Sequence, residues 1–189
     1  MDDDDFHDAS DVVVSENEME ADIRTANLAQ HLFFQNKFEE ARDLVNPSHP
    51  NMYHHHAMTG LCTLEAMMTF APDDFQHAID VADETLKHSD ILSKESLTSR
   101  INGNLFDSNR TRHWSDERVH AYLVRAESIV FKTVAGIMSS GTDIFAIAHA
   151  CLNIRESYKI FEHCEKIAQK RTWKSQLLKV WVGTIQFMN

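Results

Sequence analysis

The sequence is poor in the residues that build turns and extended linkers. It has 5 Gly and 3 Pro among 189 residues, whereas the usual combined share of these two residues is roughly 12%. Because few tight turns can form from so little Gly and Pro, we expect an all-α fold of long helices. The length suits one domain with a sizeable core, or one piece of a larger protein.

Cysteine is also scarce, and long apolar runs are lacking. Cys62, Cys151 and Cys164 are odd in number and far apart, which is typical of buried free thiols in a reducing compartment and not of a disulfide framework. No run approaches the roughly 18 apolar residues of a membrane span, and the acidic N-terminus does not fit a secretory signal. We expect a cytoplasmic protein without a transmembrane segment; peripheral membrane association stays open.

Basic residues are missing from the first 22 positions, which hold ten acidic side chains. The net charge is −11, but the rest of the chain is nearly neutral, with 19 acidic and 18 basic residues. Residues 1–20 are therefore predicted to form a disordered acidic tail, with an arm for a basic partner as the alternative. Nucleic-acid binding is disfavoured, because phosphate binding needs a basic face.

Apolar residues recur at helical spacing in two pairs of segments within residues 21–98. The second segment, "NKFEEARDLVNP", ends at proline, which lacks an amide donor and disfavours helix in the residue before it. In the other pair, a helix over about 51–70 is followed by "APDD", where Asp73 or Asp74 is well placed as an N-cap. We predict two helical hairpins.

These two hairpins carry a repeated pattern. The segments "KFEEA" and "DFQHA" align with a period of 37 residues, each placing a small Ala three positions after an aromatic residue. A period near 34 with this pattern is typical of tetratricopeptide repeats (TPR), and each first helix has a matching small position. We therefore predict an α-solenoid of TPR-like hairpins. The residues predicted at its close helix contacts are Phe38, Ala41, Ala29, Phe75, Ala78 and Ala66.

The second half of the chain is predicted to add a third hairpin. Residues 99–115 are polar, lack helical periodicity and are expected to be a loop or linker. Ser115 is a good N-cap for the hairpin over residues 116–172, in which "SSGTD" separates two apolar-periodic segments. Residues 173–189 are expected to begin a further helix.

Histidine and cysteine clusters predict no metal site. Consecutive positions on a helix point about 100° apart, so His54–His56 cannot converge on one ion. His149, Cys151, His163 and Cys164 fall on one predicted helix whose ends lie about 20 Å apart, so these four cannot share one ion either. We interpret Cys151 and Cys164 as small apolar contacts, and expect no metal and no cofactor.

No catalytic arrangement is evident in the sequence. A nucleophilic Ser or Cys needs a base and an orienting group, and Gly-x-Ser-x-Gly, phosphate-binding and HExxH motifs are missing. Arg155, Tyr158 and Lys159 form a notable polar group in a helix. We interpret Arg155 as a buried, hydrogen-bonded residue that fixes one hairpin on the next, with a partner contact as the alternative.

Four stretches resemble the tetratricopeptide repeat protein 39 family, whose fungal relatives are the inclusion-body-clearance proteins. They cover most of residues 24–165 and read "FFQNKFEEARDLV", "MYHHHAMTGLCTLEAMMTFAPDDFQHAI", "HAYLVRAESIVFKTV" and "IRESYKIFEHC". The family is not known for a catalytic site. The resemblance implies helical scaffolding: partner binding linked to protein turnover and lipid homeostasis in animals, and inclusion clearance at mitochondria and lipid droplets in fungi.

Members of that family are longer, so the resemblance also implies an N-terminal fragment that lacks further C-terminal repeats. We expect a non-enzymatic scaffold for protein partners, cytoplasmic or at the mitochondrial outer membrane or lipid-droplet surface. A membrane- or lipid-droplet-surface adaptor and a cofactor-free helical hydrolase are the alternatives. Residues 177–188, "LLKVWVGTIQFM", carry one charge, and we expect the chain alone to self-associate through them.

Overall fold

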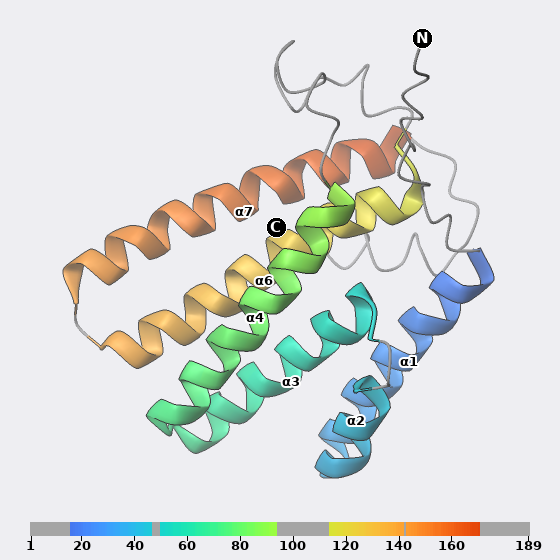
Figure 1. The fold of residues 1–189 in the computed structure, drawn as a ribbon. Helices are drawn as coiled ribbons and strands as arrows, with labels where there is room; N and C mark the ends of the chain where they lie inside the picture. Colours follow the sequence, from blue (N-terminus) through green and yellow to red (C-terminus); the bar gives the residue numbers. More distant parts are fainter. Residues whose placement is uncertain (1–15, 47–49, 94–113, 142, 171–189) are drawn as a thin grey trace, which may run out of the picture.

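Three helical hairpins make up the part of the chain that the computed structural model describes, residues 16–46, 50–93, 114–141 and 143–170. Within these ranges all regular structure is helical, with no strand, which confirms the all-α, TPR-like prediction. Figure 1 shows the helices, which are α1 (Glu16–Phe34), α2 (Phe38–Val45), α3 (Met52–Thr69), α4 (Pro72–Ser93), α6 (Asp116–Ser140) and α7 (Ile144–Lys170).

Three of the described helices begin at side-chain caps; at the start of α7, the Asp143 carboxylate accepts a hydrogen bond from the Phe145 N–H at 2.9 Å. The Asn51 side chain accepts hydrogen bonds from the backbone N–H groups of Tyr53 and His54, at 3.0 and 3.2 Å, and so caps α3. The Ser115 hydroxyl accepts a hydrogen bond from the Arg118 N–H at 3.2 Å and caps α6, as the sequence predicts. Each cap satisfies amide groups that have no partner within the first helical turn.

The start of α4 differs from the sequence prediction. The sequence predicts Asp73 or Asp74 as the N-cap, but α4 begins at Pro72 and both aspartates lie in its first turn. Proline suits the first helical position, because its missing N–H would have no helical partner there. The Asp74 carboxylate instead accepts a hydrogen bond from the Thr69 hydroxyl at 2.5 Å, across the α3–α4 turn.

The first helix begins earlier than expected. The acidic tail was predicted to extend to residue 20, but α1 begins at Glu16. Met19 is 4% exposed and packs in one cluster with Ile23, Met52 and Tyr53, so apolar contacts with α3 stabilise this first turn. The expected disorder of residues 1–15 lies outside the described residues.

Helix α6 is at the centre of the fold, because it packs against α3, α4 and α7. Val119, His120, Leu123 and Val124 are all fully buried. Trp114, which precedes the helix, is also buried and stacks on Tyr122 with 4.6 Å between ring centroids. The predicted linker over 99–115 therefore contributes a core residue at its end; residues 94–113 lie outside the described ranges.

Ion pairs join the last three helices. Arg125 of α6 pairs with Asp90 of α4 and, at 2.9 Å, with Glu156 of α7. Further along α6, Lys132 pairs with Asp83 of α4 at 2.6 Å. The order of these pairs shows that α4 and α6 are antiparallel. None of the helices within the described ranges is long and apolar enough to cross a bilayer.

Candidate protein-binding groove

Small residues set the spacing of the first two hairpins. Ala29 of α1 and Ala41 of α2 are fully buried in one cluster, which Leu61 of α3 also joins. Ala66 of α3 and Ala78 of α4 are buried in the next cluster. Each pair thus brings the two helices of a hairpin close together at the aligned positions of the two repeats.

The two aligned aromatic residues lie beside these alanines. Phe75 is buried in the cluster of Ala66 and Ala78. Phe38 is half-buried and makes an edge-to-face contact with Phe33, with ring centroids 4.9 Å apart. The difference arises because α2 is short and packs against α3 on one side, whereas α4 lies between α3 and α6.

The first helices of the hairpins, α1, α3 and α6, line a groove of about 230 Å³. Most of its lining residues come from α1 and α3, and α6 contributes Phe131. Gly60 of α3 leaves part of this space unfilled. A Cβ atom at this position would point toward the Phe131 ring, at 3.9 Å, and meet nothing else within 4 Å. The lining residues are Ile23, Ala26, Asn27, Gln30, Phe34, Tyr53, His56, Ala57, Gly60, Leu61, Leu64 and Phe131.

Two polar pairs tie the groove wall to α6. The Tyr53 hydroxyl lies 2.9 Å from His120 Nδ1, and His56 Nε2 lies 2.8 Å from the Glu127 carboxylate. Burial, reinforced by the charges of Glu117 and other nearby carboxylates, raises the pKa of Tyr53 far above its ordinary value, so its hydroxyl stays protonated. These pairs hold α3 against α6 and fix the wall on which a bound segment would lie.

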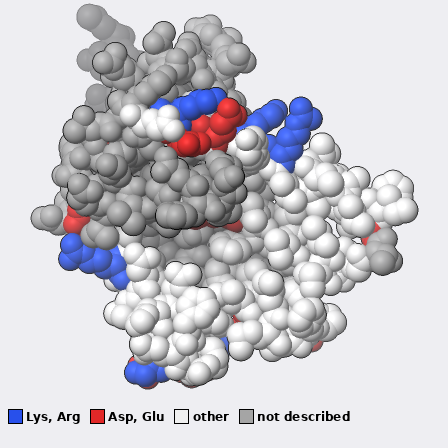
Figure 2. Space-filling model, turned by 180° about the vertical axis from the view of Figure 1, so that it is seen from behind, with Lys and Arg blue, Asp and Glu red and all other residues white. Residues whose placement is uncertain are grey.

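The groove lining contains no Asp, Glu, Lys or Arg, and His56 is its only imidazole side chain. Asn27 and Gln30 are exposed at its rim and offer amide donors and acceptors, whereas the rest of the lining is largely apolar. Seen from behind, most of the described surface is likewise uncharged, with Lys, Arg, Asp and Glu near its margins (Figure 2). A volume of about 230 Å³ is below the roughly 300–1,000 Å³ of small-molecule pockets, so it suits one or two apolar side chains of a larger partner.

The histidine run is divided among three contacts. His54 lies 2.8 Å from Asn51 in the α3 capping box, His55 stacks on His88 of α4 at 4.1 Å, and His56 pairs with Glu127. Burial lowers the pKa of His54; burial, and next the neighbouring His88, lowers that of His55. Among the described residues, no group of His, Cys, Asp and Glu is arranged to hold a metal ion.

The cysteines differ in exposure. Cys62 and Cys164 are buried, and burial raises their thiol pKa to about 11 and about 12. Cys151 was expected to be a buried apolar contact, but it is exposed on the outer side of α7. His149 is exposed as well, whereas His163 is buried beside Trp114, with ring centroids 5.7 Å apart. These four side chains therefore do not converge on a ligand.

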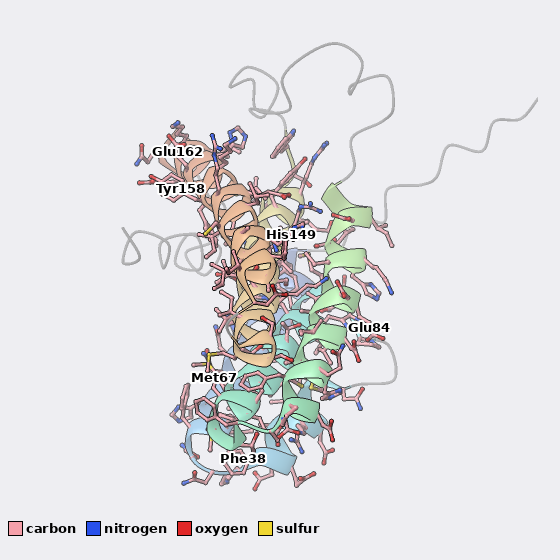
Figure 3. All side chains as sticks on the ribbon, turned by 90° about the vertical axis from the view of Figure 1, so that its left-hand side faces the viewer. Phe38, Met67, Glu84, His149, Tyr158 and Glu162 are labelled. Atoms are coloured by element: carbon pink, nitrogen blue, oxygen red, sulfur yellow. The ribbon has the colours of Figure 1, made fainter. Side chains whose placement is uncertain are left out.

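The interpretation of Arg155 as a buried residue is wrong. Arg155, Tyr158 and Lys159 are all exposed on α7, because the opposite side of that helix packs on α6 through Ser157, Ile160 and Cys164. Figure 3 views the molecule from the end where α7 begins, with Tyr158 and Glu162 near the far end of α7. A contact between this group and a partner stays a prediction.

The groove itself was not predicted from the sequence. Its residues come from three helices, and which faces of those helices meet is decided by packing between hairpins. One local feature does indicate it: Gly60 is an isolated glycine within an otherwise regular helix. Such a residue lowers helix stability, so its presence indicates a packing or functional reason.

Comparisons with known proteins give one consistent result. The family model described as Iml2/Tetratricopeptide repeat protein 39 matches residues 27–181. The chain is also similar to the tetratricopeptide repeat protein ttc-39B of Caenorhabditis elegans, with 27% identity over 183 residues that cover 94% of this chain and 30% of that relative. The chain thus spans less than a third of the relative's length. No solved structure matches the chain.

Proposed function

Because the chain belongs to the Iml2/tetratricopeptide repeat protein 39 family, we propose that it is a non-enzymatic scaffold that binds partner proteins through the α1–α3–α6 groove. The observation that supports this proposal is the groove's lining, which is largely apolar, contains no Asp, Glu, Lys or Arg, and has a volume suited to side chains. The preferred ligand is an uncharged segment of a partner protein with one or two large apolar side chains.

The polar rim supports binding of a polypeptide. Asn27 and Gln30 lie three positions apart on α1, so their side chains are neighbours on one helix face. Their amides can donate to and accept from the backbone of a bound segment. A charged anchor would lose hydration in this groove and find no Asp, Glu, Lys or Arg among its lining residues, which disfavours acidic and basic motifs.

The alternative function, a cofactor-free hydrolase, would need an activated nucleophile, and the two buried cysteines do not supply one. With thiol pKa values raised to about 11 and about 12, Cys62 and Cys164 are protonated at neutral pH, whereas the nucleophile is the thiolate.

A second candidate function, adaptor binding at a lipid surface, is favoured by a separate observation. The turns α3–α4 and α6–α7 lie at the same end of the molecule (Figure 1), where the exposed apolar side chains are Met67, Met68, Phe70, Met138, Ile144 and Phe145. Such a group is unusual on a water-facing surface. The links to lipid homeostasis, protein turnover and inclusion clearance, and a location at mitochondria or lipid droplets, belong to this proposal.

The groove can be tested by filling it. Gly60→Leu places a branched side chain in the groove without loss of helix propensity, since Leu is the better helix former. Gly136→Leu is the matched control, because Gly136 lies outside the groove lining and a Cβ there meets nothing within 4 Å. Partners captured by the unmodified chain are identified, and the bound segment of each is titrated against all three proteins by calorimetry.

We expect Gly60→Leu to weaken binding at least tenfold, whereas Gly136→Leu leaves it within twofold. Equal affinity for all three proteins would exclude the groove as the binding site. The lipid candidate is tested by flotation with neutral phosphatidylcholine vesicles, comparing the unmodified chain with Phe145→Ser. Flotation that Phe145→Ser abolishes would favour the adaptor; failure of the unmodified chain to float would exclude it.

A further inference from the structure

Helix α7 repeats helix α4. The segments "AIDVADETLKHS", residues 78–89, and "AIAHACLNIRES", residues 146–157, align without a gap. The buried sides correspond: Ala82 aligns with Ala150 and Ser89 with Ser157, and all four are at most 5% exposed. Near these positions, the Thr85 hydroxyl of α4 lies 2.7 Å from the Thr59 hydroxyl of α3, and α7 packs on α6. The two helices are therefore equivalent second helices in consecutive repeats.

The second face of α4 packs against α6, the next helix that the structure describes. Ile79 and Leu86 pack against clusters that contain α6 residues, and Asp83 and Asp90 form ion pairs with α6. These positions follow the spacing four, three, four, so they form one stripe along α4. The stripe of α4 is thus the attachment surface of the following antiparallel helix.

The equivalent stripe of α7 has no described helix on it. Its residues are Ile147, Cys151, Ile154 and Tyr158, at the same spacing of four, three, four. Ile147, Ile154 and Tyr158 are 45%, 49% and 57% exposed, and Cys151 is exposed as well. Tyr158 stands on the outer side of α7 in Figure 3. Exposed apolar residues that align along a helix in this way mark a contact surface.

We propose that a further helical segment packs on this stripe, and that residues 177–188 of the same chain, "LLKVWVGTIQFM", occupy it instead of mediating the self-association expected from the sequence. Charge is the first argument. The α4 stripe carries Asp83 and Asp90, which pair with Lys132 and Arg125 of α6. The aligned positions of α7 are Cys151 and Tyr158, which carry no carboxylate. A segment that packs on the α7 stripe therefore needs apolar residues at the positions equivalent to Lys132 and Arg125. Residues 177–188 carry a single charge, at Lys179.

Chain order and reach are the second argument. Helix α4 receives the next helix that the structure describes, α6, and residues 177–188 are the apolar segment that follows α7 in the sequence. Tyr158 lies about 18 Å from Lys170 along the axis of α7. The six residues 171–176 can span about 20 Å when extended, which brings residue 177 level with Tyr158. Twelve residues then cover about 18 Å as a helix, enough to reach Ile147.

The alkylation rate of Cys151 reports occupation of the stripe. Full-length protein is treated with N-ethylmaleimide, and each cysteine is followed by peptide mass spectrometry; Cys62 and Cys164 are buried internal references. Ile154→Asp and Trp181→Asp disturb the seat and its occupant respectively. Leu152→Asp is the matched control, because Leu152 adjoins Cys151 and is 61% exposed but lies off the stripe.

We expect Ile154→Asp and Trp181→Asp each to speed Cys151 alkylation at least tenfold, and Leu152→Asp to change it less than twofold. In Val182→Cys protein, mild oxidation should link the introduced thiol to Cys151 within one chain. Equal alkylation rates in all variants, together with no such link, would overturn the proposal. Protection that grows with protein concentration, or a link between two chains, would assign the stripe to a second copy and also overturn it.

Discussion

The Tyr53 hydroxyl of α3 and His120 Nδ1 of α6 lie 2.9 Å apart in the interior, 67 positions apart in the sequence. Their rings also meet edge to face, with centroids 5.9 Å apart. Because α3 and α6 belong to different hairpins, this pair fixes the second repeat on the third. It also places Tyr53 in the wall of the groove.

Tyr53→Phe is expected to lower the free energy of unfolding by about 1–3 kcal/mol, because it removes a hydrogen bond from the fully buried His120. Urea unfolding followed by circular dichroism measures the change. Tyr158→Phe is the control, since Tyr158 is exposed, and it should alter the free energy by less than about 0.5 kcal/mol. A neutral Tyr53→Phe would show that the hydrogen bond contributes nothing net.

Ala78→Leu is expected to destabilise the protein by about 1–3 kcal/mol, because Ala78 is 1% exposed between α3 and α4 and a larger side chain would overpack that contact. The same change at the exposed Ala148 should cost little. Thermal unfolding compares the two. If Ala78→Leu were tolerated as well as Ala148→Leu, Ala78 would not mark the close contact of the repeat.

Stability is expected to fall as the pH drops from 7 to 5. Burial lowers the pKa of His54, His55 and His163 in the folded protein, so below about pH 6.5 the unfolded chain binds protons more readily. The stabilisation from these neutral histidines is complete above that pH and is lost as the pH falls toward their folded-state pKa values.

The pH dependence can be assigned with His55→Gln. This change removes a half-buried imidazole that stacks on His88, so the fall in unfolding free energy between pH 7 and 5 should be smaller than in the unmodified protein. Ala148→Gln, at an exposed position without an ionisable side chain, should leave the slope unchanged. Identical slopes for all three proteins would show that His55 does not titrate in this range.

Zinc titration is expected to show no tight one-to-one binding, because His54, His55 and His56 make contacts with Asn51, His88 and Glu127 in three different directions. Isothermal titration calorimetry at pH 7.5 measures this directly. Stoichiometric uptake of zinc that disappears in His55→Ala would contradict the assignment of these histidines to structural contacts.

Much of the local structure was predictable from the sequence, because it depends on neighbouring residues. The spacing of apolar residues predicted the positions of the helices, and proline predicted the end of α2. Ser115 predicted the start of α6, and the two Phe–Ala pairs predicted the repeat. The predicted N-cap of α4, Asp73 or Asp74, was wrong by two or three positions, because Pro72 takes the first helical position and both aspartates follow it. The groove could not be predicted, because its lining combines α1, α3 and Phe131 of α6.

What the sequence determined by itself is the set of helices, the repeat register and the family, since periodicity, caps and small residues act over a few positions. Tertiary structure alone decided which apolar and polar faces are covered. Helix α6 is buried from several sides, so His120 is in the core, whereas α7 packs on one side and leaves Cys151 and Arg155 exposed. Exposure depends on which helices surround a residue, and no short sequence pattern contains that information.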